Sequence, residues 1–225
     1  MNLCTGGYYA DGLFDRRVFV KYPSQAGAYF QWANNNLPRR AYHPLNPAGA
    51  ISSWQQNYPT TYWNSLAASH EVCPSGYYRP NDGPTDSHTS VTGTSPSISE
   101  MRQSLWINPP EYQVSDISNS FYGYLADGFF DRGVIQSNRY VINSSVPARI
   151  GRLFHNPYNN ASLFFAYTGH RYIIDGRFVD TNTGAYWNSS SYAAERGMSM
   201  GMTEAGSYSS SASKHYGLPI RCVKN

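Results

Sequence analysis

The residue types in this sequence that could carry chemistry are histidines, cysteines and scattered carboxylates. No histidine has the i, i+4 or cysteine-paired spacing of a metal site; the six are His43, His70, His88, His155, His170 and His215. Asp82, Asp86 and His88 lie in one loop and could bind a cation, but we favour ordinary solvated loop polarity. The sequence contains neither a Gly-x-Ser-x-Gly turn nor a phosphate-binding loop. We therefore predict a protein that is not an enzyme and that holds no metal or other cofactor.

The three cysteines, Cys4, Cys73 and Cys222, allow at most one internal disulfide, because an odd count leaves one over. A bridge between Cys73 and Cys222 would close a long loop and stabilise the fold by about 4 kcal/mol in the chain-entropy model. The alternative is a pair of buried thiols. The residues alone leave both options open.

A segment rich in Tyr and Ser, from Gly184 to Tyr216, is the candidate for a contact surface. It holds four Tyr and nine Ser. Antibody-like contact surfaces favour these residues, because Tyr gives large rigid area and Ser, Gly and Asn give adaptable hydrogen bonds. The predicted contact residues are Tyr186, Tyr192, Tyr208 and Tyr216 for stacking, and Asn188, Glu195, Arg196, Ser199, Thr203, Ser210 and His215 for polar contacts. Trp187 is expected beneath them, in the core. The alternative is that the segment forms ordinary polar loops of a β domain.

The composition limits the classes of partner. The chain has 225 residues and a net charge of +3, with 14% charged residues against about a quarter in average proteins. No run of Lys or Arg suggests a nucleic-acid stripe or a polybasic membrane patch. No stretch approaches the roughly 20 apolar residues of a membrane-spanning helix, and the first residues, MNLCTGG, lack the regions of a signal peptide. The 20 Tyr with many Gly and Pro predict loop-rich β structure of an extracellular kind.

The elements that would position these residues are mostly strands. The run GMSMGMT at 197–203 alternates strictly, which predicts a half-buried strand with its methionines inward. The run at 161–180 reads as a hairpin in which LFFAY and RYII pair across Thr-Gly-His, with a further turn at Asp175-Gly176. We expect a short aromatic strand or helix at 26–37 and a long surface loop at 38–61.

One helix has a clear start signal. Ser97 and Glu100 form a capping-box pattern ahead of an apolar run that ends at Trp106. Strands are expected at 139–143 and in the closing run YGLPIRCVKN. The fold class predicted from this pass is α+β, with mostly short antiparallel strands, long loops and one or two short helices.

An eleven-residue motif occurs twice, as YYADGLFDRRV at 8–18 and as YLADGFFDRGV at 124–134, with eight identical positions. Asp-Gly between apolar residues is a tight-turn signal. The motif lacks the dense carboxylates of a calcium loop. We interpret each copy as a turn with a local Asp–Arg pair and buried aromatic residues.

Four motifs in this order, CPSGYYRP, LFFAYTGHRYIIDG, GAYWNSSSY and YGLPIRCVK, make the chain resemble the FISUMP family, also called the Fib_succ_major domain. The resemblance covers roughly Tyr29 to the C-terminus with gaps. It implies a C-type-lectin-like fold, taken here as one domain over 1–225 with 1–25 as an N-terminal extension. It also implies a disulfide between Cys73 and Cys222, which leaves Cys4 outside the match and unpaired.

The resemblance also bears on two activities known for the lectin-like fold, calcium-dependent sugar binding and formylglycine generation. C-type lectins hold calcium with a Glu-Pro-Asn type loop and a Trp-Asn-Asp strand, whereas this chain has Trp187-Asn188-Ser189 and no such loop. Calcium-dependent sugar binding by that route is therefore not expected. Formylglycine-generating enzymes share the broad fold and use paired reactive cysteines, whereas Cys73 and Cys222 fall at structural positions of the resemblance.

The sequence thus favours a ligand-binding or adhesion module that is extracellular, cell-surface or virion-displayed. Its partner would be a surface glycan or protein of a host or bacterial cell, without nucleic acid or direct membrane insertion, and it would belong to a larger pilus, envelope or phage assembly. A narrower hypothesis is a variable protein of a diversity-generating retroelement, since such proteins use a lectin-like fold and vary in a C-terminal segment placed like 184–216. The alternatives are a structural domain of a fimbrial, envelope or phage-tail protein and, less favoured, a formylglycine-generating-type enzyme or a hydrolase.

Overall fold

The computed structural model describes residues 2–5, 18–19, 27–32, 40–42, 49–54, 71–83, 99–107, 123–126, 150–179, 182–193 and 195–225. Their elements, in chain order, are β1 (Asn2–Thr5), β2 (Val18–Phe19), β3 (Tyr29–Gln31), β4 (Arg40–Tyr42), β5 (Tyr77–Tyr78), α1 (Glu100–Leu105), β6 (Tyr124–Ala126), β7 (Gly151–Asn156), β8 (Ala161–Ala166), β9 (His170–Arg171), β10 (Phe178–Val179), β11 (Gly184–Ala193), β12 (Arg196–Met202), β13 (Ser207–Ser213) and β14 (Arg221–Lys224). These elements are mostly antiparallel strands with little helix, so the expected α+β class fits only roughly.

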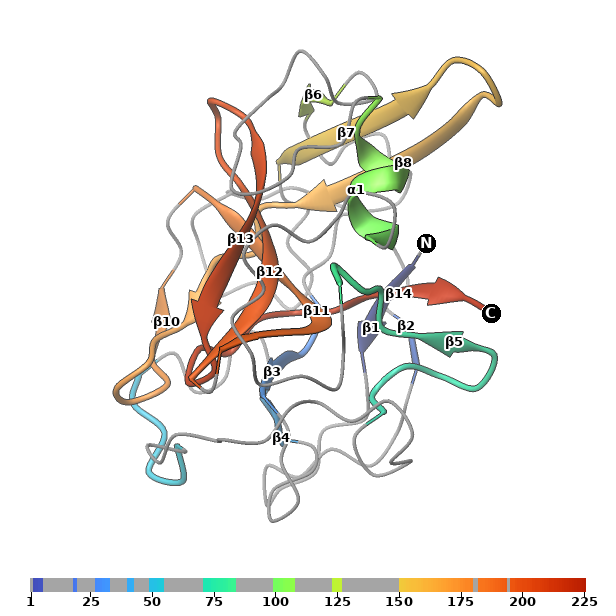
Figure 1. Ribbon diagram of the computed structural model, residues 1–225. Helices are drawn as coiled ribbons and strands as arrows, with labels where there is room; N and C mark the ends of the chain where they lie inside the picture. The colour runs from blue at the N-terminus through green and yellow to red at the C-terminus, as the bar shows by residue number, and fades with distance from the viewer. Residues whose placement is uncertain are drawn as a thin grey trace.

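Strands from both ends of the chain share one sheet, in the order β2-β1-β14-β5. Asn2 pairs with Cys222, and Val223 pairs with Tyr78, both in antiparallel register. The N- and C-termini therefore lie side by side (Figure 1). Strand β14 confirms the predicted closing strand. The division into one domain with an N-terminal extension stays a prediction, although β1 from that stretch pairs directly with β14.

The central sheet, β11-β12-β13, is covered on both faces. Met200 pairs with Tyr186 on one side and with Ser209 on the other. Met198, Met200 and Met202 are at most 1% exposed, which confirms the inward methionines. Ser199, on the opposite face of β12, is also buried. The strand is thus enclosed on both faces rather than half-buried.

Two core clusters cover these two faces. On the methionine face, Tyr186, Met200 and Met202 pack with residues from α1, β7 and β8, including Met101, Leu105, Trp106, Phe154 and Phe165. On the tryptophan face, Trp187 packs with Phe30, Trp32, Leu218, Ile220 and Cys222, among others. The Trp187 indole N–H donates to the Phe30 carbonyl at 2.7 Å, and its ring meets Trp32 edge to face. The predicted core position of Trp187 is confirmed, and burying such a side chain stabilises the fold by about 1.5–3 kcal/mol.

The hairpin predicted over 161–180 is wrong in its pairing. Strand β8 pairs with β7 across a four-residue turn, and β9 pairs with β10. Gly169, at φ 66°, turns the chain between β8 and β9 toward a different neighbour. The predicted turn at Asp175-Gly176 is confirmed, because Gly176 has φ 69° and its N–H donates to the Tyr172 carbonyl at 3.0 Å.

The predicted short helix is α1, but its cap is Ser99 rather than Ser97, which lies outside the described residues. The Ser99 hydroxyl accepts the N–H of Arg102 at 3.1 Å, as an N-cap does. The same hydroxyl donates to the buried carboxylate of Asp82. The contact with Asp82 therefore decides which serine caps the helix. The helix ends at Trp106, as expected.

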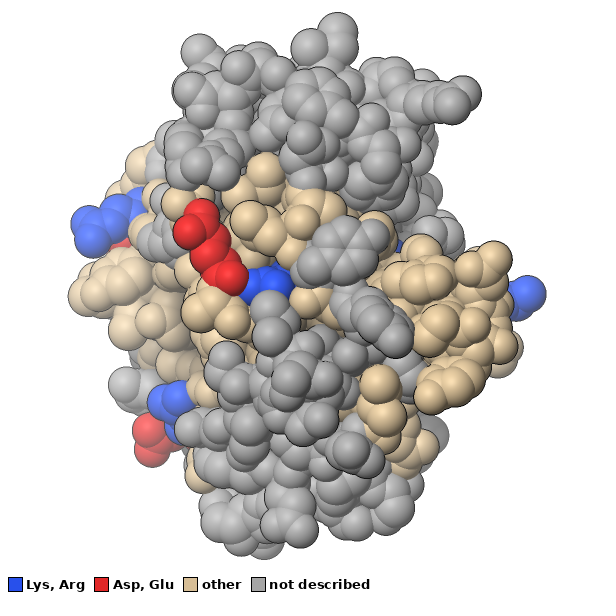
Figure 2. Space-filling view, turned by 90° about the horizontal axis from the view of Figure 1, so that it is seen from above, with Lys and Arg blue, Asp and Glu red and all other residues tan. Residues whose placement is uncertain are grey.

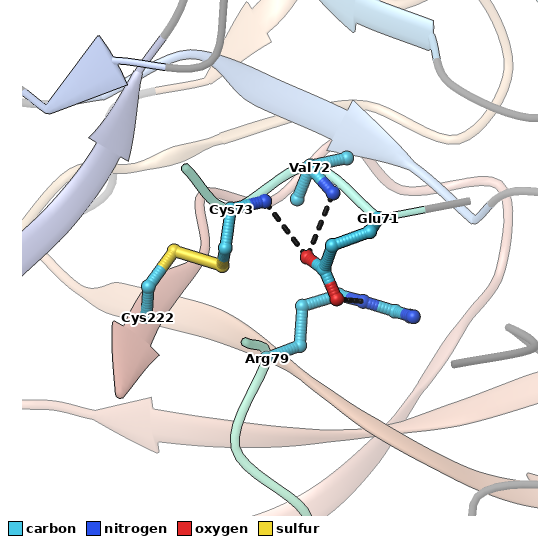
Figure 3. The surroundings of a disulfide bond; sticks show 5 residues. All are labelled: Glu71, Val72, Cys73, Arg79 and Cys222. Carbon is cyan, nitrogen blue, oxygen red and sulfur yellow. Dashed lines mark hydrogen bonds and ion pairs between the residues drawn. A yellow bond between two sulfur atoms is a disulfide. The ribbon is translucent and has the colours of Figure 1, made fainter. Parts of the chain in front are cut away.

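A disulfide joins Cys73 to Cys222 across 149 residues, with the two Cα atoms 5.9 Å apart. This confirms the pairing that the family resemblance implied. Beside it, one Glu71 oxygen accepts the N–H groups of Val72 and Cys73 at 2.8 and 2.7 Å (Figure 3). The other oxygen lies 3.5 Å from the Arg79 Nε atom, and burial lowers the pKa of Arg79 to about 10. The bridge thus closes a locally ordered turn onto the last strand.

Other sequence predictions agree with the structure only in part, or concern residues that it does not describe. The aromatic element at 26–37 contains strand β3, and the loop expected at 38–61 contains its partner β4, so that segment is not all loop. Strand β6 covers the first residues of the second repeat copy. The Asp-Gly turns of both copies, the strand expected at 139–143 and the Cys4 side chain lie outside the described residues.

Candidate functional site

A hollow of about 200 Å³ lies on the tryptophan face of the central sheet. We call it the sheet hollow. Its lining residues are His170, Thr183, Gly184, Ala185, Ser199, Gly201, Tyr208, Ser210, Ser211, Ala212, Tyr216 and Leu218. They come from the central sheet, from β9 and from the turn before β14.

Small residues on β12 leave room for this hollow beside the Tyr208 ring. A Cβ atom on Gly197 would come within 2.1 Å of the Trp32 ring, so Trp32 covers that end of the strand. A Cβ atom on Gly201 would come within 2.4 Å of the Tyr208 ring, which covers the other end. Ser199 lies between them, and its hydroxyl donates to the Ser210 carbonyl at 3.3 Å. The floor of the hollow is therefore backbone and hydroxyl, and the aromatic residues among its lining are Tyr208 and Tyr216, with His170 beside them; Trp32 covers the part of β12 beyond the lining.

Four of the predicted contact residues meet in the sheet hollow: Ser199, Tyr208, Ser210 and Tyr216. The strand register explains this convergence. Ser199 is opposite Ser210, and Gly201 is opposite Tyr208, so these residues share one face of the β12–β13 pair. Tyr216 follows at the turn that leads into β14.

Sequence reasoning predicted only four of the lining residues and missed the others, among them His170. Its ring meets that of Tyr216 edge to face, with centroids 5.1 Å apart. Gly169 forms a parallel bridge with Gly184, which brings β9 beside β11. A Cβ atom on Gly184 would lie 2.8 Å from the Ala166 carbonyl oxygen, so the close approach needs glycine there. A single histidine in the sequence carries no signal for such a contact.

Three predicted contact residues are corrected, because their side chains are buried. Tyr186 is 1% exposed, packs on the methionine face and donates its hydroxyl to the Ala166 carbonyl at 2.8 Å. Asn188 is fully buried at the irregular stretch of β11, and His215 is 6% exposed. These three side chains are buried and are not among the residues that line the sheet hollow, so a ligand there would not meet them; Ser199, although only 5% exposed, lies at the floor of the hollow.

The other predicted contact residues remain outside the sheet hollow: Tyr192, Glu195, Arg196 and Thr203. Glu195 and Arg196 are exposed at the β11–β12 turn. Arg196 donates to the Ser211 hydroxyl at 2.8 Å and so ties β12 to β13. Their role in contact stays a prediction, and the structure assigns Arg196 a local structural bond.

Among the described residues that line the sheet hollow, none is Lys, Arg, Asp or Glu. Elsewhere the described charges are sparse. On the face shown in Figure 2 they are scattered and form no continuous patch of one sign. An uncharged site lined by hydroxyls and aromatic rings suits a neutral polar ligand better than an ionic one.

Lys214 lies just before the His215-Tyr216 turn that leads to the hollow. It is 1% exposed, and its ammonium nitrogen lies 5.1 Å from the centroid of the Trp32 ring. Burial lowers the pKa of Lys214 from 10.5 to about 8, because a buried ammonium loses its hydration. The folded chain therefore releases this proton at lower pH than the unfolded chain.

We expect the free energy of unfolding to rise by about 2 kcal/mol between about pH 8 and pH 9.5. In that window the unfolded chain binds the Lys214 proton and the folded chain does not, so raising the pH favours folding. Urea titrations at several pH values measure the slope. Lys214→Met should lose the rise; an equal slope in both proteins would contradict the assignment.

A network of buried charged and hydroxyl side chains lies on the methionine face of the central sheet, and we call it the Asp82 network. The side chains of Asp82 and Arg102 are fully buried and joined by two hydrogen bonds, of 2.6 and 3.1 Å. Hydroxyls of Ser99 and Ser209 donate to the same carboxylate, and the Asp82 N–H donates to the Ser190 hydroxyl at 2.7 Å. The network connects the loop before α1 with α1, β11 and β13.

This network corrects the view of Asp82 as solvated loop polarity. Its carboxylate is saturated by protein donors and is neither solvated nor open to a cation. Asp86 and His88 lie outside the described residues. Among the described residues, no group of three or more His, Cys, Asp or Glu could hold a metal ion. In the same part of the chain, no helix has the length and apolar character needed to cross a membrane.

Comparison with family models, with curated proteins and with solved structures finds no match to this chain. The site and the fold are therefore interpreted from their own geometry. What the structure defines is a mostly antiparallel β protein with a disulfide and an uncharged hollow on its central sheet.

Proposed function

We propose that this protein is a ligand-binding module for adhesion, and that the sheet hollow recognises a glycan or a protein on a host or bacterial cell surface. The observation that carries the proposal is the convergence of Ser199, Tyr208, Ser210 and Tyr216 on one uncharged hollow. Tyrosine and serine together provide rigid contact area and adaptable hydrogen bonds. The proposed function is non-catalytic.

The rigidity of the support favours recognition. The hollow's floor belongs to a sheet packed on both faces, and the disulfide anchors the neighbouring β14. A preorganised surface loses less entropy on binding than a mobile loop. A disulfide is also consistent with display outside the cell, on a pilus, envelope or phage particle.

The proposal includes the narrower hypotheses from the sequence. We propose a C-type-lectin-like domain related to the FISUMP family, and a segment at 184–216 that a retroelement could diversify. Supporting this version, three of the four converging residues, Ser199, Tyr208 and Ser210, lie on one face of the β12–β13 pair rather than in a loose tail. Sister sequences test it: substitutions gathered on the hollow's outward positions support a diversified binder, and evenly spread substitutions contradict one.

Tyr208→Ala and Tyr216→Ala are each expected to weaken binding about tenfold or more, because each removes an aromatic wall of the hollow. The partner is first identified on an array of glycans and cell-surface proteins with the purified chain, and affinities are then measured by calorimetry. Gly201→Ala should act similarly while keeping both tyrosines, since the new Cβ atom displaces the Tyr208 ring.

Glu204→Ala is the matched control, because Glu204 is exposed in the same segment, is not one of the predicted contact residues and is not among the residues that line the hollow. It should leave both affinity and thermal stability unchanged. Unaltered affinity in all three hollow variants would contradict the assignment of the binding site to the sheet hollow.

A second candidate is a structural domain without a ligand, in a larger fimbrial, envelope or phage-tail protein. The volume of about 200 Å³ favours it, since most small-molecule sites have about 300–1,000 Å³. This candidate predicts no partner on the array and equal stability of the native chain with and without the array's glycans.

A further inference from the structure

A second hollow, of about 360 Å³, lies between α1 and the β7–β8 hairpin. We call it the hairpin hollow. Figure 1 shows α1 beside this hairpin, at the end of the molecule away from β3 and β4. Two residues of its floor, Leu105 and Phe154, belong to the cluster that covers the methionine face. The hairpin hollow and the sheet hollow therefore lie on opposite sides of the central sheet.

The lining combines an apolar floor with a neutral polar rim. Leu105, Phe154 and Leu163 form the floor, and side-chain amides and hydroxyls form the rim. None of the lining residues that the structure describes is charged. A charged ligand would lose its hydration here without gaining a counter-charge, so the site favours a neutral one.

Two asparagine amides at the rim are held in fixed orientation. The Asn156 side-chain oxygen accepts the N–H of Tyr158 at 2.9 Å, and the Asn159 side-chain oxygen accepts the N–H of Ala161 at 3.0 Å. Each oxygen is thus engaged by the hairpin turn. No described residue accepts a hydrogen bond from either Nδ2 group, which leaves two oriented donors at the rim.

An aromatic ring stands at the tip of the same turn. Tyr158, between the two asparagines, is 82% exposed, the most exposed of the large apolar side chains described. Its ring has a face available for stacking and a hydroxyl for hydrogen bonding. A tight turn that places a bare tyrosine between two oriented amides has the features of a recognition site.

We propose that the hairpin hollow binds one ring of a neutral carbohydrate. A pyranose ring presents C–H groups on its faces, which suit the apolar floor, and hydroxyls at its edge, which accept from the two amides. Tyr158 is not among the lining residues, but it lies in the turn between the two asparagines and offers an exposed ring beside the hollow. The volume of about 360 Å³ falls in the range of small-molecule sites. The site is separate from the one in the proposed function, and either can exist without the other.

The test is a titration of the full ¹⁵N-labelled chain, followed by NMR, with the methyl glycosides of glucose, galactose, mannose and N-acetylglucosamine. Glycerol serves as the polyol control. At least one glycoside should shift the side-chain amide signals of Asn156 and Asn159 saturably, with a dissociation constant of about 1 mM. Glycerol should not.

Two variants sharpen the result. Asn159→Asp keeps the oxygen that accepts the Ala161 N–H but removes the donor, and Tyr158→Ala removes the stacking ring. Each should weaken glycoside binding about tenfold. Asn182→Asp makes the same chemical change at an asparagine outside this hollow and should leave the affinity for the glycoside unchanged.

Four outcomes would overturn the proposal. The first is no saturable shift with any of the four glycosides, and the second is an equal response to glycerol. The third is unchanged affinity in both Asn159→Asp and Tyr158→Ala. The fourth is a response confined to Ser199, Tyr208 and Tyr216, which would place carbohydrate in the sheet hollow and support the proposed function instead.

Discussion

Asp82→Ala is expected to lower the free energy of unfolding by about 3–5 kcal/mol, a large share of the stability of an average domain. The substitution leaves the fully buried guanidinium of Arg102 without its counter-charge. It also removes the acceptor for the hydroxyls of Ser99 and Ser209. Chemical denaturation followed by circular dichroism measures the change.

A matched control comes from the other Asp–Arg pair described on this chain. Asp175 and Arg177 lie 3.7 Å apart with side chains 30% and 55% exposed. Asp175→Ala should therefore cost less than about 1 kcal/mol. The double variant Asp82→Leu with Arg102→Met should recover much of the loss, since it removes both charges together. A similar small cost for the two aspartates would contradict the role given to the buried pair.

Replacing Cys73 and Cys222 together by serine is expected to destabilise the protein by about 2–5 kcal/mol. The bridge closes a loop of 149 residues, and without it the unfolded chain gains conformational entropy. Both sulfur atoms also lie in the core cluster beneath Trp187, so serine hydroxyls would be buried there. Thermal and urea unfolding, with and without reductant, measure the effect.

Two comparisons isolate the bridge. Reducing the native chain should produce a similar loss of stability, whereas reductant should not affect the double serine variant. Cys4→Ser should retain the reductant-sensitive part of the stability, because the bridge remains intact. A reductant-insensitive native chain, with the bridge shown by mass spectrometry to be broken, would refute the energetic role of the disulfide.

The alternation of methionine with small residues along 197–203 was enough to predict which side chains of β12 face the core. Met198, Met200 and Met202 face the core as the period of two requires, and the closing strand lies where expected. The Asp175-Gly176 turn followed from local chemistry, because a turn with positive φ needs glycine. These features depend on neighbouring residues alone.

The candidate site was only partly accessible from the sequence. Tyr and Ser content pointed to the segment, but Tyr186 and Asn188 proved to be buried. Residues at alternate positions of a strand point to opposite faces, and both faces of β11 are covered. Composition cannot tell a surface face from a second interior face. His170 joined the site because its neighbour Gly169 bridges to Gly184 at the start of β11.

The buried charges were set by tertiary structure. Five of the arginines that the structure describes are at most 2% exposed, although charged residues ordinarily favour the surface; they are Arg79, Arg102, Arg152, Arg171 and Arg221. Arg152 shows the reason, because its guanidinium donates to the carbonyls of Gly123, just before β6, and of Thr203, just after β12. Irregular backbone that is enclosed needs side-chain donors. Sequence by itself determined which segments become strands and turns, through side-chain period and turn chemistry. Tertiary structure alone decided strand partners, the capping serine, the buried arginines and the two hollows, because those depend on which distant segments pack together.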